Sequence, residues 1–151
     1  MSSPAKAAAV KHALMLDGNN SSAEAVACFV GRLASEADLP HGKAYWLRLA
    51  AEEITTNISQ HGYLGPGPIW LTGEITAETV QLRIEDEAPA FDPLKHDRHA
   101  RLAVEPAERE AGGFGLLLAI HRLDGFSYRH ADGRNCNTLI MCRDQPAAAR
   151  N

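Results

Sequence analysis

The chain has 151 residues, 45% of them hydrophobic, which is the size and composition of one globular domain. Its formal net charge of −4 argues against a surface for nucleic acid or for an anionic membrane. No apolar stretch approaches the length of a membrane span. The three cysteines are odd in number and lack metal-ligand spacing, a pattern that is typical of free thiols in a reducing cytoplasm. We therefore expect a cytoplasmic protein that contacts neither nucleic acid nor a membrane directly.

The first half of the chain predicts one strand followed by two helices. Residues 1–9 are small and polar and are expected to form a flexible lead. Alternation over Val10–Leu16 predicts a strand. A capping-box pattern opens a helix over about Ser21–Ala37. A second helix ends near His61, with Gly62 as its C-cap.

The second half predicts two hairpins, separated by a charged segment and a further helix. The four strands are expected at Ile69–Thr76, Thr79–Glu85, Phe126–His130 and Thr138–Cys142. The segment Leu94–Ala111 carries many charges and is expected to be mobile. A helix is expected next, over Gly113–Leu123. Residues 144–151 are expected to form a disordered tail. This order predicts an α+β domain over residues 10–143: a two-layer sandwich with helices on one face of a mixed, mostly antiparallel sheet.

Three polar residues lie on one flank of the second predicted helix. Glu53, Asn57 and His61 are spaced at i, i+4 and i+8, beside an apolar stripe that faces the core. The stripe consists of Leu47, Ala50, Ala51, Ile54 and Ile58. Glu52 falls on the far side, facing solvent. Such a flank can line a cleft, although polar helix flanks without a function are also common.

Two further stretches have alternative interpretations. Asp86 ends a buried strand, where it could cap a turn or accept a hydrogen bond from an exocyclic amine such as that of adenine. Gly112, Gly113 and Gly115 lead into an apolar helix, where they could form a plain hinge or present backbone N–H groups to a phosphate.

In chain order, the motifs E-x-x-x-N-x-x-x-H-G-Y, D-x-x-x-x-F-D-P and G-G-x-G-L-x-L resemble the N, G1 and G2 boxes of the gyrase/Hsp90/histidine-kinase/MutL (GHKL) ATPase superfamily. Within it the chain is most similar, over about Val10–Arg143, to the RsbW-like anti-sigma-factor serine kinases. The resemblance implies the Bergerat ATPase fold, with ATP or ADP and Mg²⁺ as cofactors. It also implies a partner-switching kinase that phosphorylates a serine of a STAS-type anti-anti-sigma factor and sequesters a sigma factor. A homodimer is expected, with Val10–Ala37 as the candidate surface.

The resemblance also implies a role for each matching position. Asn57 would ligate Mg²⁺, Asp86 would bind the adenine amine, and Glu53 would be the general base for the substrate serine. His61 would either orient the site or cap its helix. The implied nucleotide-binding residues are Asn57, His61, Asp86, Ala88, Phe91, Gly112, Gly113, Phe114, Gly115, Leu116 and Thr138. Leu94–Ala111 would be the ATP lid, from which one of three arginines reaches phosphate: Arg98, Arg101 or Arg109.

The sequence departs from the family pattern at three positions: Ala88, Ala90, where the G1 box often has a second glycine, and Asn137. Ala88 stands where the G1 box usually has glycine, and its methyl group is expected near the base, where it would lower nucleotide affinity or shift the loop. Asn137 stands where a glycine often precedes the threonine, a change that asparagine tolerates well. The rival hypothesis is a non-enzymatic module of the same fold that uses nucleotide only to hold a partner-binding shape. The presence of Glu53 favours the kinase.

Overall fold

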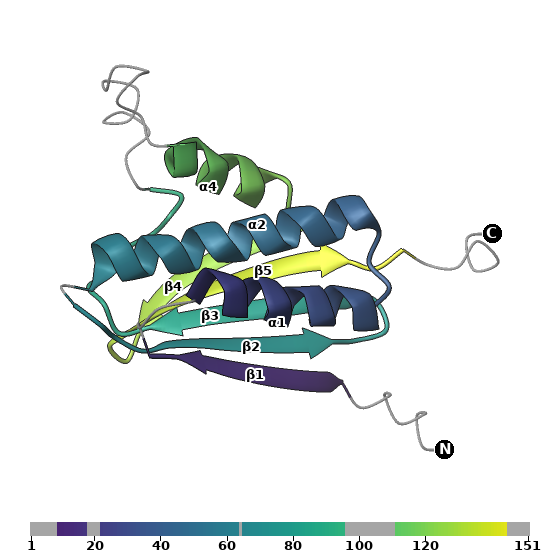
Figure 1. The fold of residues 1–151 in the computed structure, drawn as a ribbon, viewed down its shortest axis with the longest axis horizontal. Coiled ribbons are helices and arrows are strands. Elements are labelled where there is room, and N and C mark those ends of the chain that lie inside the picture. The colour runs from purple at the N-terminus through teal and green to yellow at the C-terminus, as the bar shows by residue number, and fades with distance from the viewer. Residues whose placement is uncertain (1–8, 18–21, 64, 96–110, 145–151) are drawn as a thin grey trace.

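The computed structural model describes residues 9–17, 22–63, 65–95 and 111–144, and Figure 1 shows how they are arranged. The elements are β1 (Val10–Leu16), α1 (Ser22–Glu36), α2 (His41–Asn57), the π-helix η1 (Ile58–Gly62), β2 (Ile69–Ile75), β3 (Thr79–Asp86), α4 (Ala111–His121), β4 (Gly125–Ala131) and β5 (Arg134–Cys142). Among these residues no helix has both the length and the apolar character that crossing a membrane requires.

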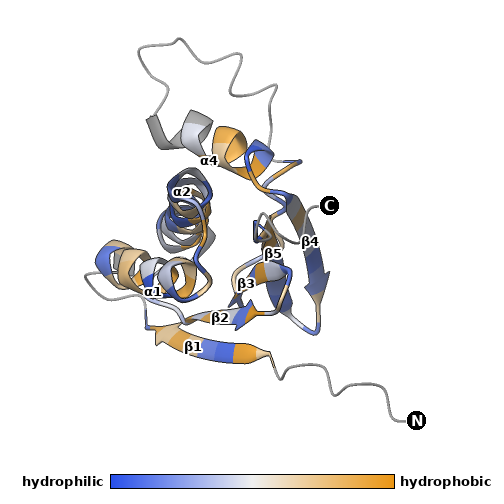
Figure 2. Cartoon of the chain, turned by 90° about the vertical axis from the view of Figure 1, so that its right-hand side faces the viewer, coloured by the Kyte–Doolittle hydropathy of each residue, from blue (hydrophilic) through white to orange (hydrophobic). Residues whose placement is uncertain are grey.

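The strands form one sheet in the order β1-β2-β3-β5-β4, and each neighbouring pair is antiparallel. Helices α1, α2 and α4 all lie on the same side of this sheet (Figure 1). Seen at right angles, the sheet curves from β1 to β4 with α2 inside the curve (Figure 2). The predicted α+β sandwich is therefore confirmed, with antiparallel pairing throughout the described sheet.

The core forms between the sheet and the helices because alternate strand residues turn inward. Strands β2 and β3 alternate strictly between buried and half-buried positions. Their inward residues meet the apolar stripes of α1 and α2. The fully buried large side chains are Val26, Val30, Leu33, Leu47, Ile54, Ile69, Leu71, Val80, Leu82, Ile84, Leu139 and Met141. This core fixes which residues at the ends of β3 and β5 face the helices.

Several element boundaries differ from the predictions. β5 begins at Arg134 rather than Thr138, because pairing with β3 extends the strand through a polar stretch. α4 begins at Ala111 rather than Gly113, so Gly112, Gly113 and Gly115 lie within the helix and not in a loop before it. The second predicted helix, expected to end near His61 with Gly62 as its C-cap, ends one residue later: its last turn is π-helical and includes Gly62, and Tyr63 is the C-cap residue.

The hairpin predicted around Asp132 and Gly133 is confirmed. Both residues have positive φ angles, 54° and 77°, which is the conformation that a two-residue turn between right-twisted strands requires. The turn pairs β4 with β5 from Ala131↔Arg134 onward. The predicted lead, lid and tail fall outside the described residues at 1–8, 96–110 and 145–151.

Candidate functional site

A pocket lies at the end of the sheet where α2 and η1 terminate, bordered by α4. Its empty volume is about 370 Å³, a figure that includes space open to solvent. Its lining residues are Ile54, Asn57, Ile58, His61, Gly62, Asp86, Ala88, Pro89, Phe91, Pro93, Leu116, Asn135 and Asn137. The pocket thus brings together residues from all three motifs, which are far apart in the sequence.

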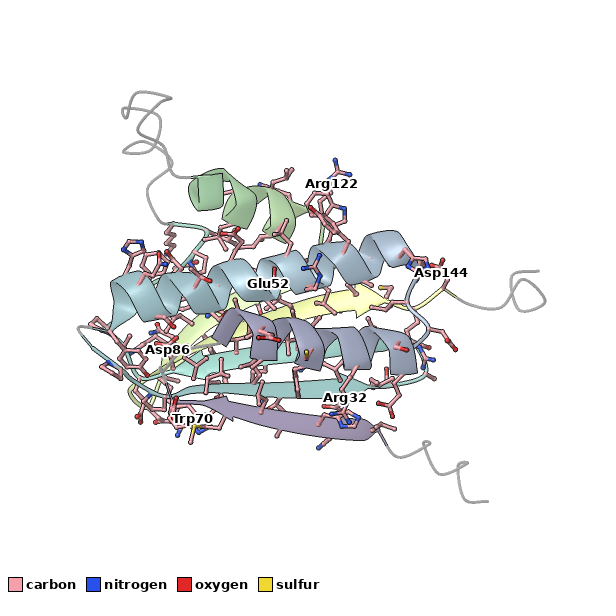
Figure 3. The ribbon with its side chains drawn as sticks, in the orientation of Figure 1. Arg32, Glu52, Trp70, Asp86, Arg122 and Asp144 are labelled. Carbon is pink, nitrogen blue, oxygen red and sulfur yellow. The ribbon has the colours of Figure 1, made fainter. Side chains whose placement is uncertain are left out.

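Asp86 is the buried carboxylate of this pocket. It is the last residue of β3, is only 1% exposed, and lies near the C-terminal end of α2 (Figure 3). Its Oδ1 accepts hydrogen bonds from the backbone N–H of Ala88 at 2.9 Å and from Asn135 Nδ2 at 2.8 Å. Burial raises the pKa of the Asp86 carboxyl above its ordinary value of 3.8, and the two hydrogen bonds offset part of that rise. Because both bonds use Oδ1, Oδ2 is the atom that a ligand can approach.

Asn135 holds the loop that follows Asp86. Its Nδ2 also donates to the carbonyl oxygens of Ala88 at 3.0 Å and Pro89 at 3.1 Å. Its Oδ1 accepts from the backbone N–H of Phe91 at 3.0 Å and from the hydroxyl of Tyr128. The Tyr128 hydroxyl itself accepts from the same Phe91 N–H at 3.0 Å. One buried asparagine on β5 therefore fixes both the carboxylate and the wall of the pocket beside it.

The π-helical turn η1 carries the rim of the pocket. Asn57 ends α2 and His61 lies in the last turn of η1, and both line the pocket. π-Helical turns are rare and occur frequently at functional sites. Beyond the turn, the Tyr63 hydroxyl donates to Pro68 O at 2.6 Å and accepts from the Glu87 N–H at 2.7 Å. The tyrosine of the H-G-Y motif thus ties the end of η1 to the segment after Asp86.

Glu53 lies beside the pocket, at the contact between α2 and α4, and does not line it. A Cβ atom built on Gly115 would stand 2.9 Å from Glu53 Oε1. Gly115 therefore allows the carboxylate to approach the N-terminal half of α4. The positive end of the helix dipole favours a negative group there.

The structure places the predicted site residues in three groups. Those lining the pocket are Asn57, His61, Asp86, Ala88, Phe91 and Leu116. Gly112, Gly113 and Phe114 lie in the first turn of α4. The lid residues Arg98, Arg101 and Arg109 lie outside the described residues.

The prediction for Thr138 is wrong. Thr138 pairs with the outward-facing Arg83 and does not line the pocket, whereas its neighbour Asn137 does. Because strand side chains alternate, only one of the two can face the helices. Leu139 and Met141 are buried at the same phase as Asn137, but Ile140 and Cys142 follow Thr138 with a similar apolar pattern, so the sequence alone did not decide the phase. Asn135 and Asn137 are the functional candidates that the motif analysis missed.

The methyl group of Ala88 is accommodated by a glycine opposite. Ala88 is 4% exposed, and a Cβ atom built on Gly62 would lie 3.1 Å from the Ala88 Cβ. The two backbones therefore approach closely, and Ala88 both lines the pocket and packs against the end of η1. Where the family usually has a glycine in the G1 box, this chain has Ala88, and the absence of a side chain at Gly62 leaves room for its methyl group.

The site fits Mg²⁺ only in company with a phosphorylated ligand. The described residues contain no group of three or more His, Cys, Asp or Glu side chains that could hold a metal ion. Asn57 supplies one carboxamide at the pocket. Mg²⁺ commonly takes one or two protein oxygens and completes its shell with phosphate oxygens and water.

An antiparallel sheet covered on one face by helices, with a pocket that combines a buried aspartate and an asparagine from the long helix, defines an ATPase domain of the GHKL type. Comparisons with known proteins agree. The chain matches the Histidine kinase-like ATPase domain over residues 18–143. It is 35% identical over 97 residues to the Serine/threonine-protein kinase BtrW of Bordetella bronchiseptica, covering 63% of this chain and 68% of that protein.

The fold is also similar to that of the RsbU and RsbW domains of Rv1364c from Mycobacterium tuberculosis, with a TM-score of 0.64 at 18% identity. The match covers 91% of this chain and 34% of that one, so the chain spans about a third of that solved structure's length. The chain belongs to the histidine kinase-like ATPase domain family.

Proposed function

We propose that the chain binds ATP with Mg²⁺ in this pocket and transfers the γ-phosphate to a serine of a STAS-type anti-anti-sigma protein. The observation that carries the proposal is the buried carboxylate of Asp86, held through one oxygen, in a pocket whose other walls are largely apolar. Burying a carboxylate costs free energy unless it is paired, so a ligand that donates a hydrogen bond to it gains strongly. The amine of adenine is such a donor, and Ile54, Ile58 and Leu116 offer apolar surface to a flat base.

The phosphates would extend from the base toward the first turns of α4, where backbone N–H groups and the helix dipole favour anions. Asn57 would contribute its amide oxygen to the Mg²⁺ that neutralises the phosphates. When bound, Mg²⁺ supplies charge neutralisation for the transferred phosphoryl group. The chain itself positions the nucleotide through Asp86 and orients Asp86 through Asn135.

Glu53 is the proposed general base. Its carboxylate lies against Gly115, on the side of the pocket where the phosphates would be placed. A base there can take the proton of a serine hydroxyl as that oxygen attacks the phosphorus. Glu52 points elsewhere, since it pairs with Arg48 at 3.2 Å on the outer surface of α2.

The proposed biological role is partner switching between a sigma factor, which the chain sequesters, and the anti-anti-sigma substrate. Phosphorylating the substrate serine adds negative charge beside Glu53 and the remaining ADP, and this repulsion would release the product. A partner docked over the phosphates can sense whether the γ-phosphate is present. The similarity to BtrW, a Serine/threonine-protein kinase, supports the kinase activity in this proposal.

The test is to incubate the purified chain with Mg²⁺, radiolabelled ATP and a candidate STAS-type partner protein, with a serine-to-alanine version of that protein as control. The expected result is label on the intact partner and none on the alanine version. Binding of ATP without any transfer would instead identify the non-enzymatic module. Co-purification under ATP and under ADP then measures whether nucleotide controls the exchange of partners.

A further inference from the structure

Tyr63 joins three segments beside the pocket. It is the first residue after η1, and its N–H donates to the carbonyl oxygen of Ile58, five residues earlier, which closes the π-helical turn. Its hydroxyl donates to the carbonyl oxygen of Pro68, just before β2, and accepts from the backbone N–H of Glu87, just after β3. One side chain therefore connects the end of η1 to the paired ends of two strands.

Packing fixes the direction in which this hydroxyl points. A Cβ atom built on Gly67 would lie 2.5 Å from carbon atoms of the Tyr63 ring, so the ring lies directly against the backbone of Gly67, and it also packs against the hydrophobic core. Burial raises the pKa of the Tyr63 hydroxyl above its ordinary value of 10.0, and the bond from the Glu87 N–H offsets part of that rise. The hydroxyl is thus protonated at neutral pH and can donate one hydrogen bond while it accepts another.

The hydroxyl connects two parts of the chain that carry pocket residues. Glu87 directly follows Asp86, the residue proposed to bind adenine, whereas η1 directly follows Asn57, the proposed Mg²⁺ ligand. Asn135 ties the loop after Asp86 to β5, and the Tyr63 hydroxyl ties the same loop to η1. The hydroxyl therefore helps to fix the position of Asp86 relative to Asn57.

We propose that Tyr63 is a positioning residue for the nucleotide, whose hydroxyl holds the base end of the pocket at a fixed distance from the phosphate end. This inference rests on the proposed binding of ATP. A ligand that contacts Asp86 and Asn57 together binds more tightly when both are already in place, because binding then does not have to order the loop. Tyr63 does not line the pocket, so it acts through the loop and not by touching the ligand.

The experiment measures the affinity for Mg²⁺–ATP by calorimetric titration in the wild type, in Tyr63→Phe and in Tyr45→Phe. Phenylalanine keeps the ring against Gly67 and removes only the hydroxyl. Tyr45 is the matched control, because it is a tyrosine of α2 that is 46% exposed and does not line the pocket. We expect Tyr63→Phe to bind ATP about three- to tenfold more weakly, the effect of about one hydrogen bond, and Tyr45→Phe to bind like the wild type.

A double-mutant cycle distinguishes positioning from a general effect on stability. In the Asp86→Asn background, Tyr63→Phe should change the ATP affinity less than about twofold, since the charged contact that it positions is already gone. A loss of the same size in both backgrounds would overturn the inference. Urea unfolding measures the stability of each variant. A Tyr63→Phe protein that does not fold, or that is less stable but binds ATP like the wild type, would show that the hydroxyl serves only the fold.

The kinase assay provides a second readout. Tyr63→Phe should raise the KM for ATP and leave kcat unchanged, because Glu53, the proposed base, lies at the contact between α2 and α4 and not on the loop that Tyr63 holds. A lower kcat with an unchanged KM would indicate fewer folded molecules and would contradict the positioning role.

The titration separates this inference from the proposed function. If the wild type and Tyr63→Phe bind ATP equally well, the role of Tyr63 is refuted while ATP binding stands. If the wild type does not bind ATP, both are refuted. A loss of affinity in Tyr45→Phe equal to that in Tyr63→Phe would also overturn the assignment.

Discussion

Replacing Asn135 with alanine should destabilise the folded protein by about 2–3 kcal/mol. The structure shows which of its contacts are costly to lose. Asp86 Oδ1 would still accept from the Ala88 N–H, and the Phe91 N–H would still donate to Tyr128. Pro89 is exposed, so water can replace the bond to its carbonyl oxygen. Two bonds are left without replacement, one to the Ala88 carbonyl oxygen and one from the Tyr128 hydroxyl, at about 1–1.5 kcal/mol each.

Urea unfolding at neutral pH measures this loss, with Tyr128→Phe as a graded control. Tyr128→Phe removes one hydroxyl from the same network and should cost about 1 kcal/mol. Hydrogen exchange provides the local readout: the Phe91 amide should lose part of its protection in Asn135→Ala, because Tyr128 remains as an acceptor but its hydroxyl loses the Asn135 oxygen that orients it. A change below about 1 kcal/mol, or unaltered exchange at Phe91, would refute the role of Asn135 as the residue that holds the loop.

Three further outcomes are expected. Gly115→Ala should cost little stability in the same unfolding assay, like Gly31→Ala, which meets no atom within 4 Å, because the flexible end of Glu53 can move away from a Cβ that would stand 2.9 Å from its Oε1. It should instead slow phosphate transfer, because it displaces the proposed base, and an unchanged transfer rate would contradict that role. Because burial raises the pKa of Asp86 in the folded state, the nucleotide-free protein loses stability as the pH rises from 3.8 through that pKa. Asp86→Asn cannot titrate, so the difference in unfolding free energy between the variant and the wild type, measured with urea, should change in favour of the variant as the pH rises and then level off. A difference that does not depend on pH would contradict the raised pKa. Glu53→Gln should slow phosphate transfer about 10²–10⁴-fold in the kinase assay with unchanged ATP affinity, and an equal effect of Glu52→Gln would show that the wrong glutamate was chosen.

The sequence predicted most of the fold, because its hydrophobic periodicity is local. The strict alternation in β2 and β3 and the apolar stripe of α2 are visible in the chain itself. The pocket residues Asn57 and Asp86 could be found because each belongs to a motif of fixed spacing. The start of α4 was predicted too late, since its glycines are poor helix formers and only packing against α2 holds them in the helix.

The role of β5 in the site could not be predicted from motifs. Asn135 reaches Asp86 only through sheet pairing between residues 49 positions apart. The sequence also left open which residues of β5 face the helices. Ile140 follows Thr138 on one face of the strand, just as Leu139 follows Asn137 on the other face, so both faces contain apolar residues. A one-residue change in phase turns every side chain to the other face, which is why the pocket residue is Asn137 and not Thr138.

The most direct test of the central claim is the affinity for Mg²⁺–ATP of the wild type and of Asp86→Asn, measured by calorimetric titration. A charge-assisted hydrogen bond to the adenine amine contributes about 1.5–3 kcal/mol, so the variant should bind about tenfold to a hundredfold more weakly while remaining folded. Glu85→Gln, one residue earlier and on the opposite face of β3, should bind like the wild type. Equal affinity of the wild type and Asp86→Asn for ATP would contradict the assignment of this pocket as the nucleotide site.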